Sequence, residues 1–305
     1  MHIVEIPEAD IKVYFPEHLG ECSKEQYINM CRLLFKNMTD EISYEELKTH
    51  AVYYLMNMKR VDGGVIEIEN KKLENVLLLS ELAEGFFEKV PEENQKKIKL
   101  YFINNPIYKI TAFRDYYGPS DEFNNVKFGE YVDALGYYAD FNQTKELHYL
   151  KMLTATFYRE KKPFYKRFGK SYMTDSRINY SSERSSMICY KLRFLNVGVF
   201  YGFYLLFASF QKYLTTAKLY VQGVEIDVSV LYKDFGLGSN FKSSLPGIGI
   251  RSIQYTLAES GIFGSLEDLR QIPLWEVFIR LYDIRKRDLD AYEQLKSNPT
   301  NVANN

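Results

Sequence analysis

The sequence predicts a mainly α protein: an irregular helical bundle with a central buried helix and a few short peripheral strands. Helix-capping signals recur along the 305 residues, and apolar residues follow them at helical spacing. A segment at 194–210 carries no charged residue, and 46% of the chain is hydrophobic, which suffices for a large core. We expect an N-terminal helical region at 1–118, a C-terminal helical region at 119–296 and a disordered tail at 297–305.

Two capping patterns mark the start of the first helices. Ser23 is followed three residues later by Gln26, and Ser43 by Glu46. A serine oxygen at such a position accepts a hydrogen bond from the third helical amide, while the Gln or Glu side chain reaches back. Further helices are predicted at 75–90, at 126–141, at 145–158 with Thr144 as N-cap, at 248–260 with Gly261 as C-cap, and from Ser265 to the 280s.

Short strands are expected in three places, near 10–15, 65–69 and 221–231, where apolar and polar residues alternate. An Asp-Gly-Gly turn at 62–64 precedes the second of these and favours a small hairpin there. Residues 104–125 contain several Asn, Gly and Pro residues. We therefore expect a loop there, and the boundary between the two helical regions.

The uncharged segment 194–210 is either a membrane span or the buried core helix of a soluble protein. A span needs about 20 apolar residues to cross roughly 30 Å of hydrocarbon, and this segment is shorter, with polar residues inside and cations at its flanks. We therefore expect a buried helix over 194–216 and no membrane partner. Gly198 and Gly202, four residues apart, would allow a second helix to approach closely.

Charge and cysteine content narrow the class of protein. The net charge of −1 gives no overall field that favours nucleic acid or a membrane surface. Three cysteines, Cys22, Cys31 and Cys189, make no disulfide framework and fit a reducing compartment. With His18 the first two form a small group, but they lack the paired spacing that zinc sites show, so no metal site is predicted.

No pattern of catalytic residues is convincing. Gly236, Lys242 and Ser243 fall in the register of a phosphate-binding loop, but Phe241 stands where a second glycine must let the backbone close around phosphate. Nucleophile and metalloprotease motifs are absent from the sequence. We therefore predict no catalytic residues, no cofactor and no enzymatic activity.

The sharpest local feature is a basic segment at 158–193. It has ten Lys or Arg against three acids, so its formal charge is +7 and that of the remaining chain is −8. We expect a flexible or extended basic loop over 159–186. Interleaved aromatic rings can stack on bases while cations hold phosphates, so 159–193 is a candidate nucleic-acid interface. The other interpretation is a plain solvated loop, or one that docks on the acidic remainder of this protein or of a partner. The candidate nucleic-acid residues are Lys161, Lys162, Lys166, Arg167, Lys170 and Arg177.

The C-terminal block 250–282 carries an aromatic stripe. Trp275, Phe278 and Ile279 lie three or four residues apart on one helical face, and Tyr282 extends that face by one turn. The stripe either closes the core or forms a protein interface, for which one Trp and its neighbours are typical hot-spot residues.

Three segments together resemble a known group of proteins: ECSKEQYINMCRLLF, LKMLTATFYRE and SIQYTLAESGIFGSLEDLRQIPLWEVFIRLY, at 21–35, 150–160 and 252–282. They resemble uncharacterised proteins of tailed bacteriophages and prophages that are encoded near tail genes. The resemblance implies a non-enzymatic virion structural or tail-assembly protein in the bacterial host cytoplasm or the virion. Its expected partners are other phage structural or assembly proteins, with homo-oligomer formation left open. The alternative is a nucleic-acid-binding accessory protein that uses 159–193.

Overall fold

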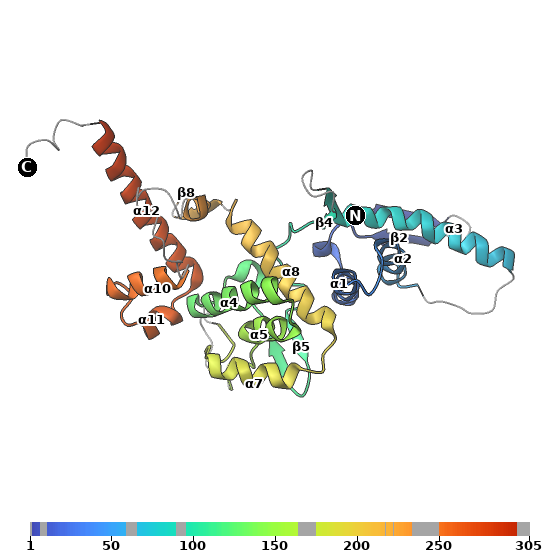
Figure 1. Cartoon of the computed structure of the whole chain (residues 1–305), viewed down its shortest axis with the longest axis horizontal. Helices are drawn as coiled ribbons and strands as arrows, with labels where there is room; N and C mark the ends of the chain where they lie inside the picture. The colour runs from blue at the N-terminus through green and yellow to red at the C-terminus, as the bar shows by residue number, and fades with distance from the viewer. Residues whose placement is uncertain are drawn as a thin grey trace, which may run out of the picture.

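The computed structural model describes residues 2–6, 11–58, 66–89, 96–163, 175–216, 218–221, 223–233 and 250–297. Helices dominate these residues, and the strands form only two-stranded antiparallel sheets. The molecule is elongated, with helix α3 (Ile66–Leu82) projecting at one end and helix α12 (Leu274–Ser297) at the other (Figure 1). The predicted mainly α bundle is confirmed.

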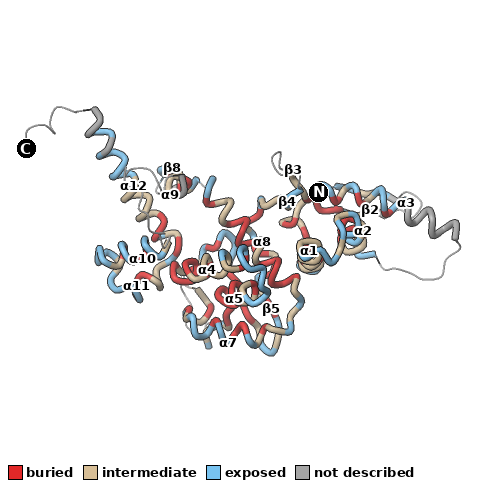
Figure 2. Tube along the Cα trace, viewed as in Figure 1, coloured by how far each residue is buried: buried red, intermediate tan, exposed pale blue. Residues whose placement is uncertain are grey.

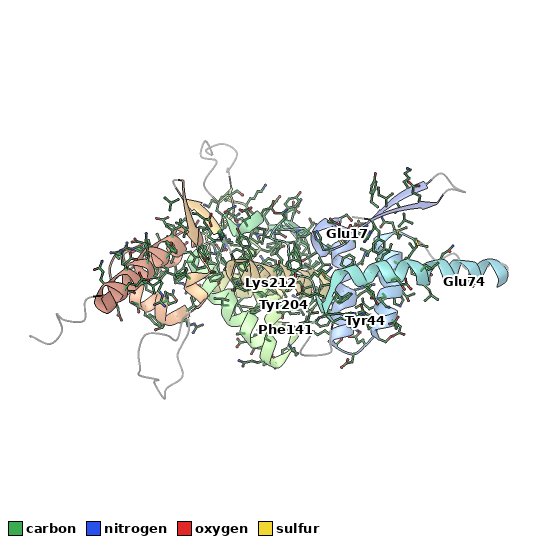
Figure 3. The ribbon with its side chains drawn as sticks, turned by 90° about the horizontal axis from the view of Figure 1, so that it is seen from above. Glu17, Tyr44, Glu74, Phe141, Tyr204 and Lys212 are labelled. Carbon is green, nitrogen blue, oxygen red and sulfur yellow. The ribbon has the colours of Figure 1, made fainter. Side chains whose placement is uncertain are left out.

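Helix α8 (Val197–Leu214) is the central element. Thirteen of its eighteen residues are buried, and Figure 2 shows it largely in the colour of buried residues. The buried hydroxyl of Ser209 in this helix accepts a hydrogen bond from the backbone N–H of Phe102 and donates one to its C=O. Tyr204 stacks edge-on against Phe141 from another helix, with ring centroids 5.0 Å apart (Figure 3). The predicted central buried helix is confirmed, and in the described ranges no helix combines the length and apolarity needed to cross a bilayer.

The N-terminal elements begin with a hairpin and a short 3-10 helix. The bounds are β1 His2–Ile6, β2 Ile11–Phe15, η2 Leu19–Glu21, α1 Lys24–Met38 and α2 Tyr44–Leu55. Both predicted capping boxes are present, at Ser23 and at Ser43. Helix α1 packs on α8, where the Tyr27 hydroxyl donates to the carbonyl of Gly202 at 2.7 Å. Gly198 and Gly202 therefore allow α1 and α8 to approach closely, as the spacing of the two glycines predicts.

The strand predicted at 65–69 is wrong, because Ile66 to Glu69 belong to α3. An alternation of apolar and polar residues over five positions is a weak strand signal. Here these positions open a run of seventeen residues without Gly or Pro, which forms the helix. The chain then forms η3 (Ala83–Phe86) and pairs β3 (Phe87–Lys89) with β4 (Lys96–Ile98). The helix predicted at 75–90 therefore starts earlier and ends at Leu82.

The middle of the chain departs from prediction in two places. A small hairpin, β5 (Lys109–Thr111) with β6 (Asp115–Tyr117), lies within the predicted loop 104–125. Thr144 ends a helix rather than capping one, since Lys145 takes a left-handed conformation (φ 60°) and the next helix starts at Leu147. The bounds here are η4 Asp121–Phe123, α4 Phe128–Thr144 and α5 Leu147–Phe157.

A further correction concerns the predicted loop 159–186. Its last residues begin helix α7 (Ser182–Leu192), which packs beside α5. The reason is a helical stripe of residues that are buried against the core: Ser185, Ile188, Cys189 and Leu192.

The C-terminal elements follow α8 in the chain. Their bounds are β7 Lys218–Val221, β8 Val224–Asp227, α9 Val230–Lys233, α10 Ile250–Glu259 and α11 Leu266–Gln271, followed by α12. Helices α10, α11 and α12 lie together at the end of the molecule that carries the C-terminus (Figure 1). The strand predicted near 221–231 is present at Val224–Asp227, and Gly261 has the positive φ (67°) expected after a helix. The single helix predicted from Ser265 is interrupted before α12, because Pro273 cannot continue the α11 hydrogen bonds.

One contiguous hydrophobic core includes residues from both predicted regions, from Phe15 to Phe278. The division of the chain near 118 stays a prediction. The tail predicted to be disordered lies, from 298 onward, outside the described residues.

Candidate docking face on helix α7

A buried ion-pair cluster anchors the basic segment. The side chains of Arg159 and Arg177 are 3% and 1% exposed. Arg159 lies 2.8 Å from both a Glu130 oxygen and an Asp175 oxygen, and the Arg177 Nε lies 2.8 Å from the other Asp175 oxygen. Burial alone would raise the pKa of Asp175, but the hydrogen bond and charge of Arg177, with the charge of Arg159, hold that pKa below its ordinary value. Two cations are thus matched by two carboxylates.

This cluster corrects one predicted contact. Arg177 was expected on a solvated loop, where it would meet phosphates. Its guanidinium instead donates to the carbonyls of Phe157 and Asn125, each at 2.8 Å, inside the protein. A guanidinium held this way is not available to a nucleic acid, and its role is to fix the chain that leads to α7.

The other predicted nucleic-acid residues are distributed differently. Lys161 is exposed and its Nζ lies 4.1 Å from the centre of the Tyr117 ring. Lys162 is partly buried and donates to the carbonyl of Asp175 at 3.1 Å. Lys166, Arg167 and Lys170 lie outside the described residues.

The outer surface of α7 and the turn after it combines cations with large exposed apolar side chains; Arg184 is exposed, and Lys191 and Arg193 are partly exposed. The exposed fractions of Met187, Tyr190 and Phe194 are 61%, 67% and 74%. The Arg193 guanidinium stacks between two rings, 3.6 Å from the centre of Tyr190 and 4.3 Å from that of Phe194. We call this surface the α7 face; it consists of Arg184, Met187, Tyr190, Lys191, Arg193 and Phe194.

A groove of about 280 Å³ runs along one side of the α7 face. Its apolar lining comes from Ile178, Met187 and Ile188. Its charged lining is mainly basic: Arg114, Arg159, Arg184 and Lys191, with the carboxylate Glu160. Glu160 lies 3.1 Å from Arg114 and 3.9 Å from Lys191, so it neutralises only part of that charge. An apolar side chain flanked by acids would fit such a groove.

The predicted C-terminal interface is largely internal. Phe278 is 1% exposed and meets Tyr131 edge-on at 5.5 Å, so it closes the core and cannot be a contact residue. Trp275 is partly buried against the core, and its indole N–H donates to the carbonyl of Glu122 at 3.1 Å. Ile279 and Tyr282 remain partly exposed, and Tyr282 packs against the small cluster formed by Ile226 and Val228.

We expect Trp275→Ala to lower the free energy of unfolding by about 3 kcal/mol, because the change removes a large packed ring. Far-UV circular dichroism during urea unfolding measures this loss. Tyr255→Ala, at a side chain that is 47% exposed on α10, is the control and should change stability little. Unchanged unfolding of the Trp275 variant together with weaker self-association would restore the interface interpretation.

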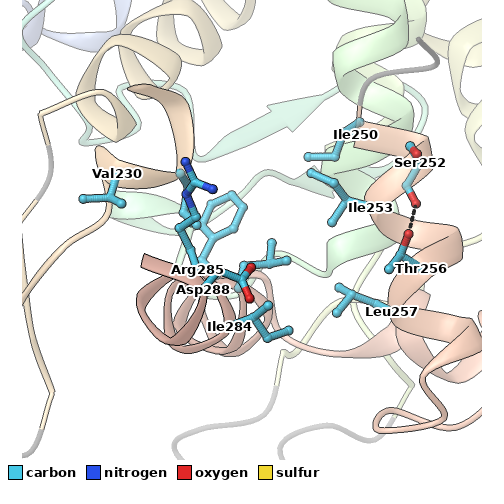
Figure 4. A pocket seen from close by; sticks show the side chains of 12 residues that line it. Val230, Ile250, Ser252, Ile253, Thr256, Leu257, Ile284, Arg285 and Asp288 are labelled. Carbon is cyan, nitrogen blue, oxygen red and sulfur yellow. Dashed lines mark hydrogen bonds between the residues drawn. The ribbon is translucent and has the colours of Figure 1, made fainter. Parts of the chain in front are cut away.

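A second cavity, of about 320 Å³, lies between α9, α10 and α12 (Figure 4). Ile250, Ile253 and Leu257 line one wall, and Arg285 and Asp288 come from the facing helix. Among the described residues that line it, none is a His or a Cys. The described lining is mainly apolar.

The three residues considered for metal binding, His18, Cys22 and Cys31, are described by the structure. His18 uses its Nδ1 to accept a hydrogen bond from the amide of Gly20. Burial raises the pKa of Cys22 to about 12 and that of Cys31 well above its ordinary value, which opposes the thiolate form that binds metal. Across the described ranges, no group of three His, Cys, Asp or Glu residues could hold a metal ion. The segment from Gly236 to Ser243 lies outside them.

Sequence reasoning missed part of the α7 face. Arg114 lies far from α7 in the chain, and Phe194 was assigned to the buried helix although it is 74% exposed. A signal for the helix was present, since Arg184, Met187 and Lys191 fall at helical spacing. Several serines and the high charge favoured a loop instead.

Comparison with family models, with curated proteins and with solved structures finds no match. The resemblance to phage proteins therefore stays a prediction, and the α7 face is the feature from which a function can be argued.

Proposed function

We propose that the chain is a non-enzymatic virion structural or tail-assembly protein of a tailed phage or prophage, which acts through protein–protein contacts. The observation that carries this proposal is the α7 face. Met, Tyr, Phe and Arg are residue types enriched at protein interfaces, and here they are exposed together beside a partly apolar groove. The three segments at 21–35, 150–160 and 252–282 add the phage context. On this proposal the protein acts in the bacterial host cytoplasm or in the virion.

The test is recovery of the chain with phage particles. A host that builds the particles is given a tagged copy, and particles and assembly intermediates are separated on a density gradient. We expect the tagged chain in one of these fractions. The variant Tyr190→Ala/Phe194→Ala should reduce its recovery, because truncating interface anchors typically costs at least about 2 kcal/mol, or more than about tenfold in affinity.

The matched control is Tyr255→Ala/Leu289→Ala, which removes exposed apolar side chains from α10 and α12. Recovery of this variant should equal that of the unmodified chain. Absence of the unmodified chain from both fractions, in a host that produces complete particles, would overturn the proposal.

Nucleic-acid binding is the second candidate function, favoured by one observation. The stacked Tyr190, Arg193 and Phe194 resemble a platform on which bases stack, with Lys161 and Arg184 as further exposed cations. Against it, Arg177 is internal and its charge is matched by buried carboxylates. We expect no gel shift of a single-stranded oligonucleotide at about 150 mM salt. A tight, salt-dependent shift that Arg193→Ala abolishes would place this candidate first.

A further inference from the structure

Helix α3 exposes a stripe that complements the α7 face. Leu77 and Leu78 are 51% and 66% exposed, while Val76 on the other side of the helix is 2% exposed. Glu74 and Glu81 flank the two leucines and are also exposed. The four positions are spaced i, i+3, i+4 and i+7, so they form one continuous surface, which we call the α3 stripe. Among the described side chains, no ion-pair partner of either glutamate is found.

The charged residues of the two helices have the same spacing. Glu74 and Glu81 are seven residues apart, as are Arg184 and Lys191. Seven residues of α-helix rise about 10.5 Å, so both carboxylates can face both cations when the helices lie alongside each other. The leucines then lie opposite Met187 and the apolar lining of the groove. Charge and apolar surface are therefore complementary in the same register.

The two surfaces lie in different parts of one molecule. Figure 1 shows α3 projecting from one end, with α7 below the central helices, and Figure 3 labels Glu74 far out on the projection. A contact between them thus needs two copies of the chain. When one such contact joins two copies, each copy keeps one of its two surfaces free for a further copy, which is the geometry of a ring or an open row.

We propose that the α3 stripe of one copy docks on the α7 face of the next, so that the protein self-associates head to tail. This inference rests on the proposed function, because both take the α7 face to be a protein-binding surface. The partner inferred here is a second copy of this chain. A single pair of helices buries little area, and its charges are at the surface. The association is therefore weak and sensitive to salt.

The experiment measures the mass of the purified full-length chain by sedimentation and light scattering. At about 50 mM salt, mass should rise with concentration above the 35.9 kDa monomer. At about 500 mM salt, the monomer should dominate because surface charges are screened. Two charge-reversal variants follow: Glu74→Lys/Glu81→Lys and Arg184→Glu/Lys191→Glu. Each should weaken association by at least about tenfold, since like charges then face one another.

Mixing the two charge-reversal variants is the decisive step. In an equimolar mixture, the basic α3 stripe of the first variant can dock on the acidic α7 face of the second. The unchanged α3 stripe of the second variant can dock on the unchanged α7 face of the first. Assembly should therefore return. The control is Asp290→Lys/Glu293→Lys, which makes the same charge change on the exposed part of α12 and should associate like the unmodified chain. All these positions are at the surface, so circular dichroism should report unchanged folding.

Three results would overturn the inference. One is an unmodified chain that stays monomeric at low salt. Another is a mixture that fails to assemble although its two variants are folded. The third is assembly that nuclease treatment abolishes, which would assign the α7 face to nucleic acid. Failure of the proposed function looks different, because there the purified chain assembles but is absent from phage particles and intermediates.

Discussion

Replacing Gly198 by alanine is expected to lower the free energy of unfolding by about 3 kcal/mol. A Cβ atom at this position would lie 2.1 Å from the backbone carbonyl oxygen of Ile28 in α1. Backbone cannot move aside as a flexible side chain can, so α1 and α8 must separate. Their separation also strains the hydrogen bond from Tyr27 to Gly202. Urea unfolding followed by circular dichroism should show a lower midpoint.

Gly136→Ala is the matched control, since Gly136 also lies within a helix of the bundle. A Cβ added there meets nothing within 4 Å. Alanine loses less conformational entropy on folding than glycine, so this variant should be more stable by roughly 0.5–1 kcal/mol. Equal effects of the two substitutions would contradict the assignment of Gly198 to a backbone contact between α1 and α8.

Replacing Arg177 by methionine is expected to cost about 3–5 kcal/mol of stability. The substitution keeps an unbranched apolar stem but removes the guanidinium, which leaves Arg159 as the single cation for the carboxylates of Glu130 and Asp175. The carbonyls of Phe157 and Asn125 also lose their donor. Most of this loss comes from the carboxylate charge that stays buried without a partner. The lost attraction between Arg177 and Asp175 contributes less. Calorimetry or urea unfolding measures the loss.

Two further variants separate charge burial from generic loss of an arginine. Arg184→Met, on the exposed side of α7, should change stability by no more than about 0.5 kcal/mol. Arg177→Met/Asp175→Asn should be less destabilised than Arg177→Met alone, because it no longer buries an unmatched carboxylate. If the stability loss of the double variant equals the sum of the losses measured for Arg177→Met and for Asp175→Asn alone, the cluster is not coupled.

Local signals predicted much of the fold. Ser23 and Ser43 begin helices because capping depends on residues only three positions away, and Gly261 follows a helix for an equally local reason. The central helix was predictable from its uncharged composition. The strand predicted at 65–69 failed because its alternation was too short to compete with the helical run that follows.

The site was less predictable because its determinants are distant in sequence. Arg177 looked solvated by its composition, and only folding brings it near Glu130, 47 residues earlier. The same holds for Arg114 at the groove beside α7. Whether a cation in a basic segment is buried or exposed depends on tertiary partners that no local pattern reports.

Trp275 is the single tryptophan of the chain, beside 26 tyrosines and 21 phenylalanines, so all tryptophan fluorescence comes from one position. Its ring meets Phe210 of α8 edge-on at 5.8 Å, so its fluorescence reports whether α12 is seated on the central helix. Circular dichroism instead averages over helices along the whole chain. If α12 detaches first, the emission moves to longer wavelength while the helical signal persists. Following both signals through one denaturation therefore distinguishes local opening of the C-terminal helix from cooperative unfolding of the molecule.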